Sequence, residues 1–239
     1  MSSIRRFPRL LVVTIAAMLL GLTLASTANA VESLPEPTDT IEPEGPSFID
    51  VPETHSFYEH IETIASWGIV KGYADGTFRP NTAVTRGQLA VMAYNYLDGY
   101  FNLDETFEPP AESPFVDLPT THTFYKHVTW LNDTDVVKGY ADGTVRPNTK
   151  LSRGQLAAIM FNLFEELGYP GVEGYEPPAE SPFSDVHEEY TFYQHIAWLE
   201  EEGIVNGYGD GTFRPDAALT RGQIAVIMVK VDRLLFSES

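Results

Sequence analysis

The sequence predicts a mainly α-helical fold of three tandem helix–turn–helix repeats. One segment occurs three times, at residues 69–80, 136–147 and 204–215, with offsets of 67 and 68 residues. Each copy contains a Gly-rich turn, and apolar residues at helical spacing lie on both sides of it. Repetition at a fixed period indicates units that share a core with their neighbours. It also argues against a single catalytic site, which would be built once, so we expect no catalytic residue.

The first thirty residues have the pattern of a secretory signal peptide. Three arginines precede an apolar stretch from Leu10 to Leu24, and Ala28-Asn29-Ala30 fits a cleavage site. The apolar stretch is short for a membrane span, which needs about 20 residues. We therefore expect no stable membrane insertion after signal cleavage, with an uncleaved anchor as the alternative. Residues 31–46 are rich in Pro and Glu and are predicted to form a disordered lead.

The composition excludes several classes of partner and cross-link. The chain has 34 acidic and 15 basic residues, a net charge of −19 and no Cys. Nucleic acid is excluded as a partner on these grounds, because its binding needs clustered positive charge. A chain without Cys has neither disulfides nor a lipidated Cys. The His spacings match no metal-ligand pattern, and we expect neither a metal site nor a cofactor.

The repeats are predicted at residues 47–97, 113–164 and 181–235. Linkers at 98–112 and 165–180 separate them and share the sequence Glu-Pro-Pro-Ala-Glu-Ser-Pro-Phe near their ends. Pro-rich linkers are semi-rigid spacers, so they would hold the units at set distances while the units pack.

The first helix of each repeat is indicated by apolar residues at helical spacing. In the first repeat these are Phe57, Ile61 and Ile64, which lie on one helical face. Gly68 supplies the C-terminal stop because glycine enters the left-handed conformation easily. Asp135 and Gly203 take that place in the other repeats. Trp130 and Trp198 are equivalent to each other; sugar stacking and core packing are both open to them, and core packing is favoured.

The second helix of each repeat opens with a capping box. Thr85 and Gln88 have the required spacing, in which hydroxyl and amide satisfy orphan backbone donors. The same pair returns as Ser152 and Gln155 and as Thr220 and Gln223. The apolar faces that follow are Leu89, Met92, Ala93 and Tyr96, then Leu156, Ile159, Met160 and Leu163, then Ile224, Ile227, Met228 and Val231.

An arginine follows each N-cap, at the first helical position. These residues are Arg86, Arg153 and Arg221. The helix dipole disfavours a cation there, and a local rule broken three times suggests a purpose. Free backbone N–H groups and a guanidinium fork would together capture an anion, and the glycine that follows each arginine would let a ligand approach. The alternative is an internal ion pair between each arginine and an aspartate of a neighbouring repeat, with Asp50, Asp117 and Asp185 as the candidates.

Two sets of aspartates repeat with the motif. Asp50 and its equivalents could hydrogen-bond sugar hydroxyls or cap the next element, and capping is favoured. Asp75 and its equivalents precede Gly76, Gly143 and Gly211 and are predicted to build turns. No run of alternating oxygen ligands closed by a Glu occurs, so a calcium loop is not supported.

The three units resemble S-layer homology domains. The resemblance rests on Phe48-x-Asp50-Val51, on Gly72-Tyr73-x-Asp75-Gly76-Thr77-Phe78-Arg79-Pro80 and on Thr85-Arg86-Gly87-Gln88, with their counterparts in the other units. It covers nearly all of the chain after the signal segment. It implies a pseudo-threefold bundle whose grooves bind a secondary cell-wall polysaccharide, often through a pyruvylated sugar.

The resemblance also implies which residues bind the polymer. In that family the arginine of a Thr-Arg-Ala-Glu helix start meets the acid of the polymer, and the turn and the early Asp line the same groove. Here Thr-Arg-Gly-Gln replaces that helix start, so a carboxylate is absent beside the arginine. The polymer-binding residues predicted in this way are Arg86, Arg153, Arg221, Gly87, Gly154, Gly222, Asp50, Asp117, Asp185, Gly76, Gly143 and Gly211.

The function expected from the sequence is non-enzymatic attachment of a secreted protein to an acidic polysaccharide of the bacterial cell wall. Other S-layer or envelope proteins are further candidate partners. One alternative is a structural protein that assembles a surface layer through protein–protein contacts. Another is a glycan hydrolase with paired carboxylates, which the threefold repetition disfavours.

Overall fold

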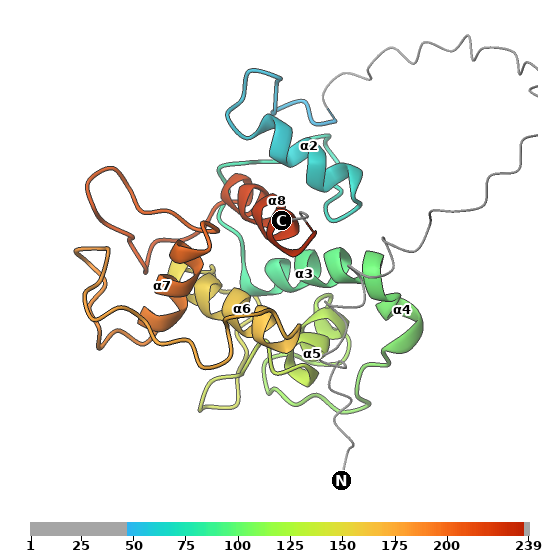
Figure 1. Cartoon of the computed structure of the whole chain (residues 1–239). Helices are drawn as coiled ribbons and strands as arrows, with labels where there is room; N and C mark the ends of the chain where they lie inside the picture. The colour runs from blue at the N-terminus through green and yellow to red at the C-terminus, as the bar shows by residue number, and fades with distance from the viewer. Residues whose placement is uncertain (1–46, 237–239) are drawn as a thin grey trace, which may run out of the picture.

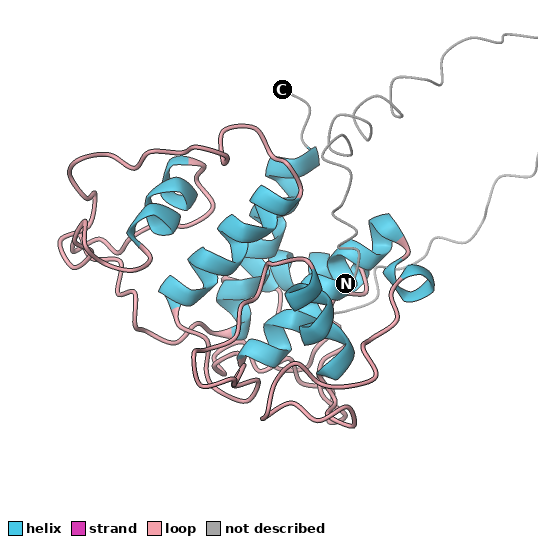
Figure 2. Cartoon of the chain, turned by 90° about the horizontal axis from the view of Figure 1, so that it is seen from below, coloured by secondary structure: helices cyan, strands magenta, loops and turns pink. Residues whose placement is uncertain are grey.

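The computed structural model describes residues 47–236, so the predicted signal peptide and the Pro/Glu-rich lead lie outside the described residues. The described part is mainly helical and without strands, which confirms the predicted fold class (Figure 2). Its helices are α2 (Tyr58–Ser66), α3 (Arg86–Phe101), α4 (Leu103–Thr106), α5 (Tyr125–Asp133), α6 (Arg153–Glu166), α7 (Tyr193–Glu201) and α8 (Arg221–Phe236).

The repeats interlock rather than stand side by side. The first helix of each repeat packs on the second helix of the repeat before it, α5 on α3 and α7 on α6. The set closes on itself because α2, from the first repeat, packs on α8, from the last. Figure 1 shows the second helices α3, α6 and α8 around the middle of the molecule and the first helices outside them. Each repeat therefore covers its apolar face only with a neighbour's help.

A cyclic set of backbone hydrogen bonds joins the three repeats just before their second helices. The N–H of Val84 donates to the oxygen of Leu219 at 2.9 Å, Leu219 donates to Leu151 at 3.0 Å, and Leu151 donates to Val84 at 2.8 Å. All three side chains are fully buried. Isolated antiparallel bridges flank these bonds, Ala83 with Thr220, Thr85 with Lys150 and Ser152 with Ala218. This arrangement gives the fold its threefold character.

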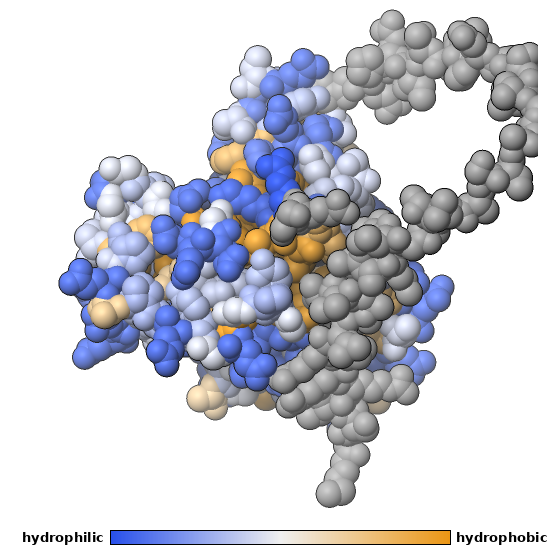
Figure 3. All heavy atoms as spheres, in the orientation of Figure 1, coloured by the Kyte–Doolittle hydropathy of each residue, from blue (hydrophilic) through white to orange (hydrophobic). Residues whose placement is uncertain are grey.

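The apolar faces predicted for the second helices are buried in the common core. Every predicted position of these faces in α3, α6 and α8 is buried. In α2, Ile61 and Ile64 are also buried, while Phe57 lies at the N-cap and packs on the core from its edge. Trp130 and Trp198 are core residues, as favoured. On the face shown in Figure 3, apolar surface lies toward the middle of the molecule with hydrophilic residues around it.

The helix boundaries follow the predicted signals. In the first repeat the hydroxyl of Thr85 accepts from the N–H of Gln88, whose amide oxygen accepts from the N–H of Thr85. The other two repeats carry the same reciprocal pair. The stops after the first helices have positive φ: 74° at Gly68, 59° at Asp135 and 68° at Gly203. Local sequence thus determines where these helices begin and end.

The segment predicted as the first linker is partly helical. α3 continues as far as Phe101, and α4 follows directly after Asn102. Leu103 is buried, and the hydroxyl of Tyr94 donates to Asp104 at 3.0 Å. The helix continues because this segment still has apolar side chains to bury before the Pro-rich sequence begins. No helix among the described residues is both long and apolar enough to cross a bilayer.

The glycine after each helix-start arginine is a point of close contact between repeats. A Cβ on Gly222 would lie 2.3 Å from the ring of Phe57, and one on Gly87 would lie 2.1 Å from the ring of Phe124. At Gly154 the corresponding ring is that of Phe192, at 2.8 Å. Each ring belongs to the next repeat in the cycle, so a side chain here would push neighbouring repeats apart.

We expect Gly222→Ala to lower the free energy of unfolding by about 1–3 kcal/mol, because the added methyl overpacks the contact that closes the first repeat onto the third. Thermal and urea unfolding followed by circular dichroism would measure the change. Gly99→Ala is the matched control: Gly99 lies in α3 with open space around it, so this change should raise stability by about 0.5–1 kcal/mol. A Gly222→Ala variant as stable as the parent would contradict the packing role.

Candidate ligand-binding grooves between the repeats

The arginine at the start of each second helix reaches into the next repeat of the cycle. The Nε–H of Arg221 donates to the backbone oxygen of Phe78 at 2.7 Å. The Nε–H of Arg86 donates to that of Val145 at 2.9 Å, and the Nε–H of Arg153 to that of Phe213 at 2.7 Å. Each acceptor lies in the repeated turn. The arginine of the third repeat therefore contacts the first repeat, that of the first contacts the second, and that of the second contacts the third.

These three cations are shielded from water, and no carboxylate in the described part of the chain pairs with them. Arg153 and Arg221 are only 9% and 7% exposed, and Arg86 is half-buried. Burial lowers the pKa of each guanidinium, yet an arginine side chain stays protonated in proteins. Within residues 47–236, no carboxylate lies within ion-pair distance of them. The guanidinium carbons instead lie over tyrosine rings, at 5.3, 5.2 and 5.1 Å from the centroids of Tyr140, Tyr208 and Tyr73.

The prediction that these helix starts offer free backbone N–H groups is wrong. The N–H of Arg86 donates to the oxygen of Thr149 at 3.0 Å, that of Gly87 to Pro147 at 2.8 Å, and that of Gln88 to the hydroxyl of Thr85. The corresponding bonds occur at α6 and α8. The space beside each glycine, expected to admit a ligand, holds a phenylalanine ring. Contacts with the next repeat therefore occupy the backbone N–H donors, and the space beside the glycines, that were predicted to bind an anion.

Asp50 and its equivalents accept hydrogen bonds from the repeated turn and do not pair with the helix-start arginines. The two carboxylate oxygens of Asp50 accept from the N–H groups of Phe78 and Arg79, at 2.7 and 2.8 Å. Arg79 has a φ of 60°, a conformation that costs energy for a residue with a Cβ. The paired hydrogen bonds fix it there. Asp117 and Asp185 do the same in their repeats, so the predicted alternative of internal ion pairs with the helix-start arginines is wrong.

The second set of aspartates builds the turns, as predicted. Asp75 accepts from both the N–H and the hydroxyl of Thr77, at 3.1 and 2.6 Å, and pairs with Arg79 at 2.8 Å. Gly76 follows with a φ of 79°. These bonds hold the pKa of the Asp75 carboxyl at about 2, chiefly through the hydroxyl of Thr77. Asp142 and Asp210 have the same contacts, and their pKa values are also about 2.

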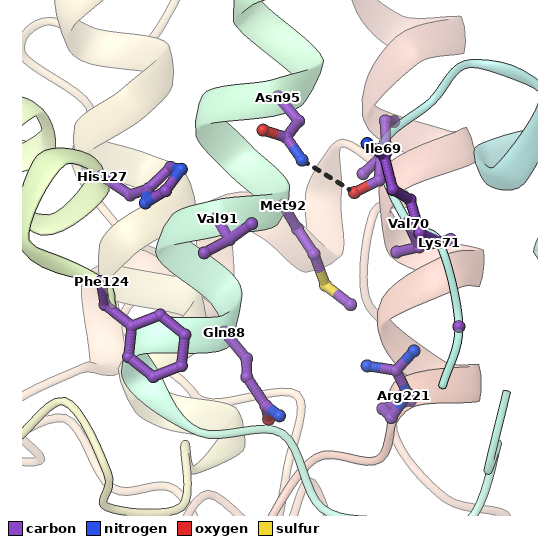
Figure 4. A pocket seen from close by; sticks show the side chains of 11 residues that line it. Ile69, Val70, Lys71, Gln88, Val91, Met92, Asn95, Phe124, His127 and Arg221 are labelled. Carbon is purple, nitrogen blue, oxygen red and sulfur yellow. Dashed lines mark hydrogen bonds between the residues drawn. The ribbon is translucent and has the colours of Figure 1, made fainter. Parts of the chain in front are cut away.

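A pocket of about 370 Å³ lies beside Arg221, where all three repeats meet. Figure 4 shows Arg221 on one side, with Gln88, Met92 and Asn95 along α3 and with Phe124 and His127 from the second repeat opposite. Lys71 also lines the pocket, and no carboxylate does. In an acidic chain, two cations and two amides therefore share one hollow. Lys71 lies within the repeated segment 69–80, but the sequence did not predict Gln88 or Asn95 as groove residues, because helical spacing identifies only the buried face of a helix.

With the pocket beside Arg221 as the first groove, equivalent positions in the other repeats define two further candidate grooves. The first groove contains Arg221, Lys71 and Asn95; the second contains Arg86, Lys138 and Asn162; the third contains Arg153, Asn206 and Lys230. In the first two, the asparagine amide donates to a backbone oxygen at 3.2 Å, that of Ile69 or Val136. Neighbouring repeats build each groove together, so none of the three exists within a single repeat.

The histidines near the grooves show no metal-binding arrangement. No group of three potential ligands occurs among the described residues. His127 packs edge-on against Tyr94, with ring centroids 5.1 Å apart, and His195 packs in the same way against Phe161 at 5.0 Å. Burial lowers the pKa of both imidazoles, which favours the neutral form. Their observed role is therefore packing between repeats.

Comparison with known proteins identifies the class to which this fold belongs. The S-layer homology domain model matches residues 47–90, 114–157 and 182–225, together more than half of the chain. The chain therefore belongs to the S-layer homology domain family and contains three tandem copies of the domain, as predicted. This membership also places the protein at the cell surface.

Individual relatives match this chain over only part of their own length. Cell surface glycoprotein 1 of Acetivibrio thermocellus is 28% identical over 172 residues, 69% of this chain and 7% of that protein. The Cellulosome-anchoring protein of the same organism is 28% identical over 188 residues, 77% of this chain and 38% of its own length. An endoglucanase of a Bacillus species is 27% identical over 184 residues, 76% of this chain and 18% of the enzyme. The chain thus spans well under half the length of these relatives.

We expect the protein to lose stability as the pH falls from about 4 to about 2. Asp75, Asp142 and Asp210 have a folded pKa of about 2 against 3.8 for a free side chain. The unfolded chain therefore binds more protons in this range, so their contribution is complete above the unfolded pKa and is lost as the pH falls through the folded one. The triple Asp→Asn variant should show a shallower dependence of the unfolding midpoint on pH, measured by circular dichroism. Equal slopes for both proteins would contradict this assignment.

Proposed function

We propose that this protein attaches non-covalently to the bacterial cell envelope by binding an acidic cell-wall polysaccharide in the grooves between its repeats. Arg86, Arg153 and Arg221 would meet the acid group of the polymer, which the family resemblance suggests is a pyruvylated sugar. The observation that carries the proposal is a shielded guanidinium in each groove that has no carboxylate of residues 47–236 within ion-pair distance. Binding alone, without catalysis, accounts for this arrangement.

The unpaired cations favour an anionic ligand on energetic grounds. A charge withdrawn from water is normally paired, because burial otherwise costs several kcal/mol. A backbone oxygen and an aromatic ring offset part of that cost, but Arg86 and Arg221 make no second side-chain hydrogen bond among the described residues. Their remaining N–H donors match the geometry of a carboxylate. A carboxylate of the ligand would therefore complete a site that the protein leaves open.

The acidic composition of the chain does not oppose this binding. A unit charge at about 20 Å contributes only about 0.2 kcal/mol in water, and salt reduces it further. A direct contact at about 4 Å near a protein surface is worth up to about 4 kcal/mol before desolvation. The local cations therefore outweigh the distant carboxylates.

The pocket beside Arg221 also suits a sugar in size and polarity. Its volume of about 370 Å³ falls within the range of about 300–1,000 Å³ usual for small-molecule sites. Gln88 and Asn95 line it with amides, which can donate to and accept from hydroxyl groups. The ring of Phe124 adds an apolar surface against which a sugar can lie.

The relatives support a module that binds while other parts of a protein do other work. One relative is named as an anchoring protein and another as an endoglucanase, and each resembles this chain over part of its length only. The region shared by an anchor and an enzyme is better explained by attachment than by chemistry. We infer that this chain performs the attachment and lacks the catalysis.

A second candidate function is assembly with other envelope proteins. Ile49 and Val116 occupy equivalent positions and are 79% and 80% exposed, which is unusual for large apolar side chains. They lie beside the turns at Gly76 and Gly143. A protein partner could cover them without using the grooves.

We expect the protein to co-sediment with purified wall sacculi and the triple variant Arg86→Gln, Arg153→Gln, Arg221→Gln to remain in the supernatant. The triple Arg→Lys variant should bind weakly, because lysine keeps the charge but loses the planar fork. Removing acid-labile substituents from the sacculi should abolish binding of the parent.

Lys150→Gln is the control for the arginine changes, because it removes one positive charge from an exposed lysine that does not line the pocket. Circular dichroism should show that every variant is folded at the assay temperature. Full retention by a folded triple Arg→Gln variant would rule out the proposed site. Loss of binding in Ile49→Ser or Val116→Ser, but not in the arginine variants, would favour the assembly function instead.

A further inference from the structure

Two groove positions exchange their residue types in the third repeat. Lys71 and Lys138 are equivalent to Asn206, while Asn95 and Asn162 are equivalent to Lys230. Every groove therefore keeps one lysine and one asparagine, but the third has them in opposite places. The lysine lies on the loop in the first two grooves and on the second helix in the third.

The loop lysines of the first two grooves are free for a ligand. Lys71 and Lys138 are exposed, and neither makes a hydrogen bond or ion pair within the described residues. Lys71 lines the same pocket as Arg221. The asparagine on the helix donates to the loop backbone instead, so it holds the groove wall without using either cation.

In the third groove, internal acceptors hold both cations. The ammonium of Lys230 donates to the backbone oxygen of Gly203 at 2.8 Å. With its amide turned so that both atoms meet suitable partners, Asn206 also accepts from Lys230 at 3.1 Å. Arg153 makes a second hydrogen bond, from Nη2 to the backbone oxygen of Asn206 at 2.8 Å. Arg86 and Arg221 make no such second bond within residues 47–236.

The lysine of the third groove also differs from the loop lysines in its burial. Lys230 is half-buried, and burial lowers its pKa, whereas Lys71 and Lys138 are exposed. A ligand in the third groove would have to displace bonds that the protein already makes. In the first two grooves the lysine makes no bond, among the described residues, that a ligand would have to displace.

We propose that the first and second grooves bind the acidic ligand, with Lys71 and Lys138 as its second cationic contacts, and that the third groove is closed by its own side chains. This inference rests on the proposed function and narrows its sites to Arg86 and Arg221, because Arg153 already donates to two backbone oxygens, those of Phe213 and Asn206. A singly charged acid would then meet an arginine from one repeat and a lysine from the next. Lys230 would be a structural residue.

Isothermal titration calorimetry of the whole chain tests the assignment. The probe is a methyl glycoside of N-acetylglucosamine carrying a pyruvate ketal, with the ketal-free glycoside as its control. We expect two equivalents of probe to bind per chain. Lys71→Asn or Lys138→Asn should weaken one of the two sites about tenfold, the loss expected for one charge-assisted contact.

The third repeat supplies a matched control and a gain-of-function variant. Lys230→Asn removes the same charge but should leave both sites unchanged, and the introduced amide can bond to the loop backbone as Asn95 does. The double variant Asn206→Lys, Lys230→Asn keeps the net charge and copies the first two grooves. It should bind a third equivalent of probe.

The outcomes separate this inference from the function on which it rests. Three equivalents bound by the parent, or equal loss from Lys230→Asn and Lys71→Asn, would overturn the inference and leave the proposed function standing. If the folded parent binds neither the probe nor the sacculi, both the inference and the proposed function are wrong. Unfolding midpoints of all variants identify any loss that comes from misfolding.

Discussion

Cyclic closure of the three repeats is the constraint on which the rest of the structure depends. Val84, Leu151 and Leu219 exchange backbone hydrogen bonds in a ring, and their side chains are fully buried. Around that ring, the first helix of each repeat covers the second helix of another. A single repeat would expose to water the apolar face that its neighbours cover in the bundle, and this exposure costs free energy. The bundle is therefore stable as a set of three.

Closure also creates the candidate sites. Each helix-start arginine meets the turn of the next repeat, and an aspartate of that repeat holds the turn in a strained conformation that presents its carbonyl. A groove therefore needs an arginine from one repeat and the turn and second helix of the next. Binding across such a boundary would couple ligand affinity to the stability of the whole bundle, because separating the repeats removes the site.

Local features were predictable from the sequence, and partners across repeats were not. The capping pair of Thr85 and Gln88, the stop at Gly68 and the buried face of α3 depend on neighbours along the chain, and all are as predicted. A period of 3.6 residues reveals which face is buried but not what covers it. For this reason two features could be seen only in the structure. The ring of Phe124 packs against Gly87, and another repeat accepts hydrogen bonds from the helix-start N–H groups.

Departures from the repeat are informative because the backbone around them is conserved within the molecule. Three equivalent turns share the same aspartate bonds, so a change in one groove cannot be attributed to a different local fold. The exchange of lysine and asparagine keeps the charge of each groove but moves it from a solvent-exposed loop to a half-buried helix position. At the helix position, the ammonium of Lys230 donates to the backbone oxygen of Gly203. Arg153 in the same groove donates to the backbone oxygen of Asn206. Because an acceptor already supplied by the protein competes with any ligand for the same donor, equal charge in three grooves does not imply equal affinity.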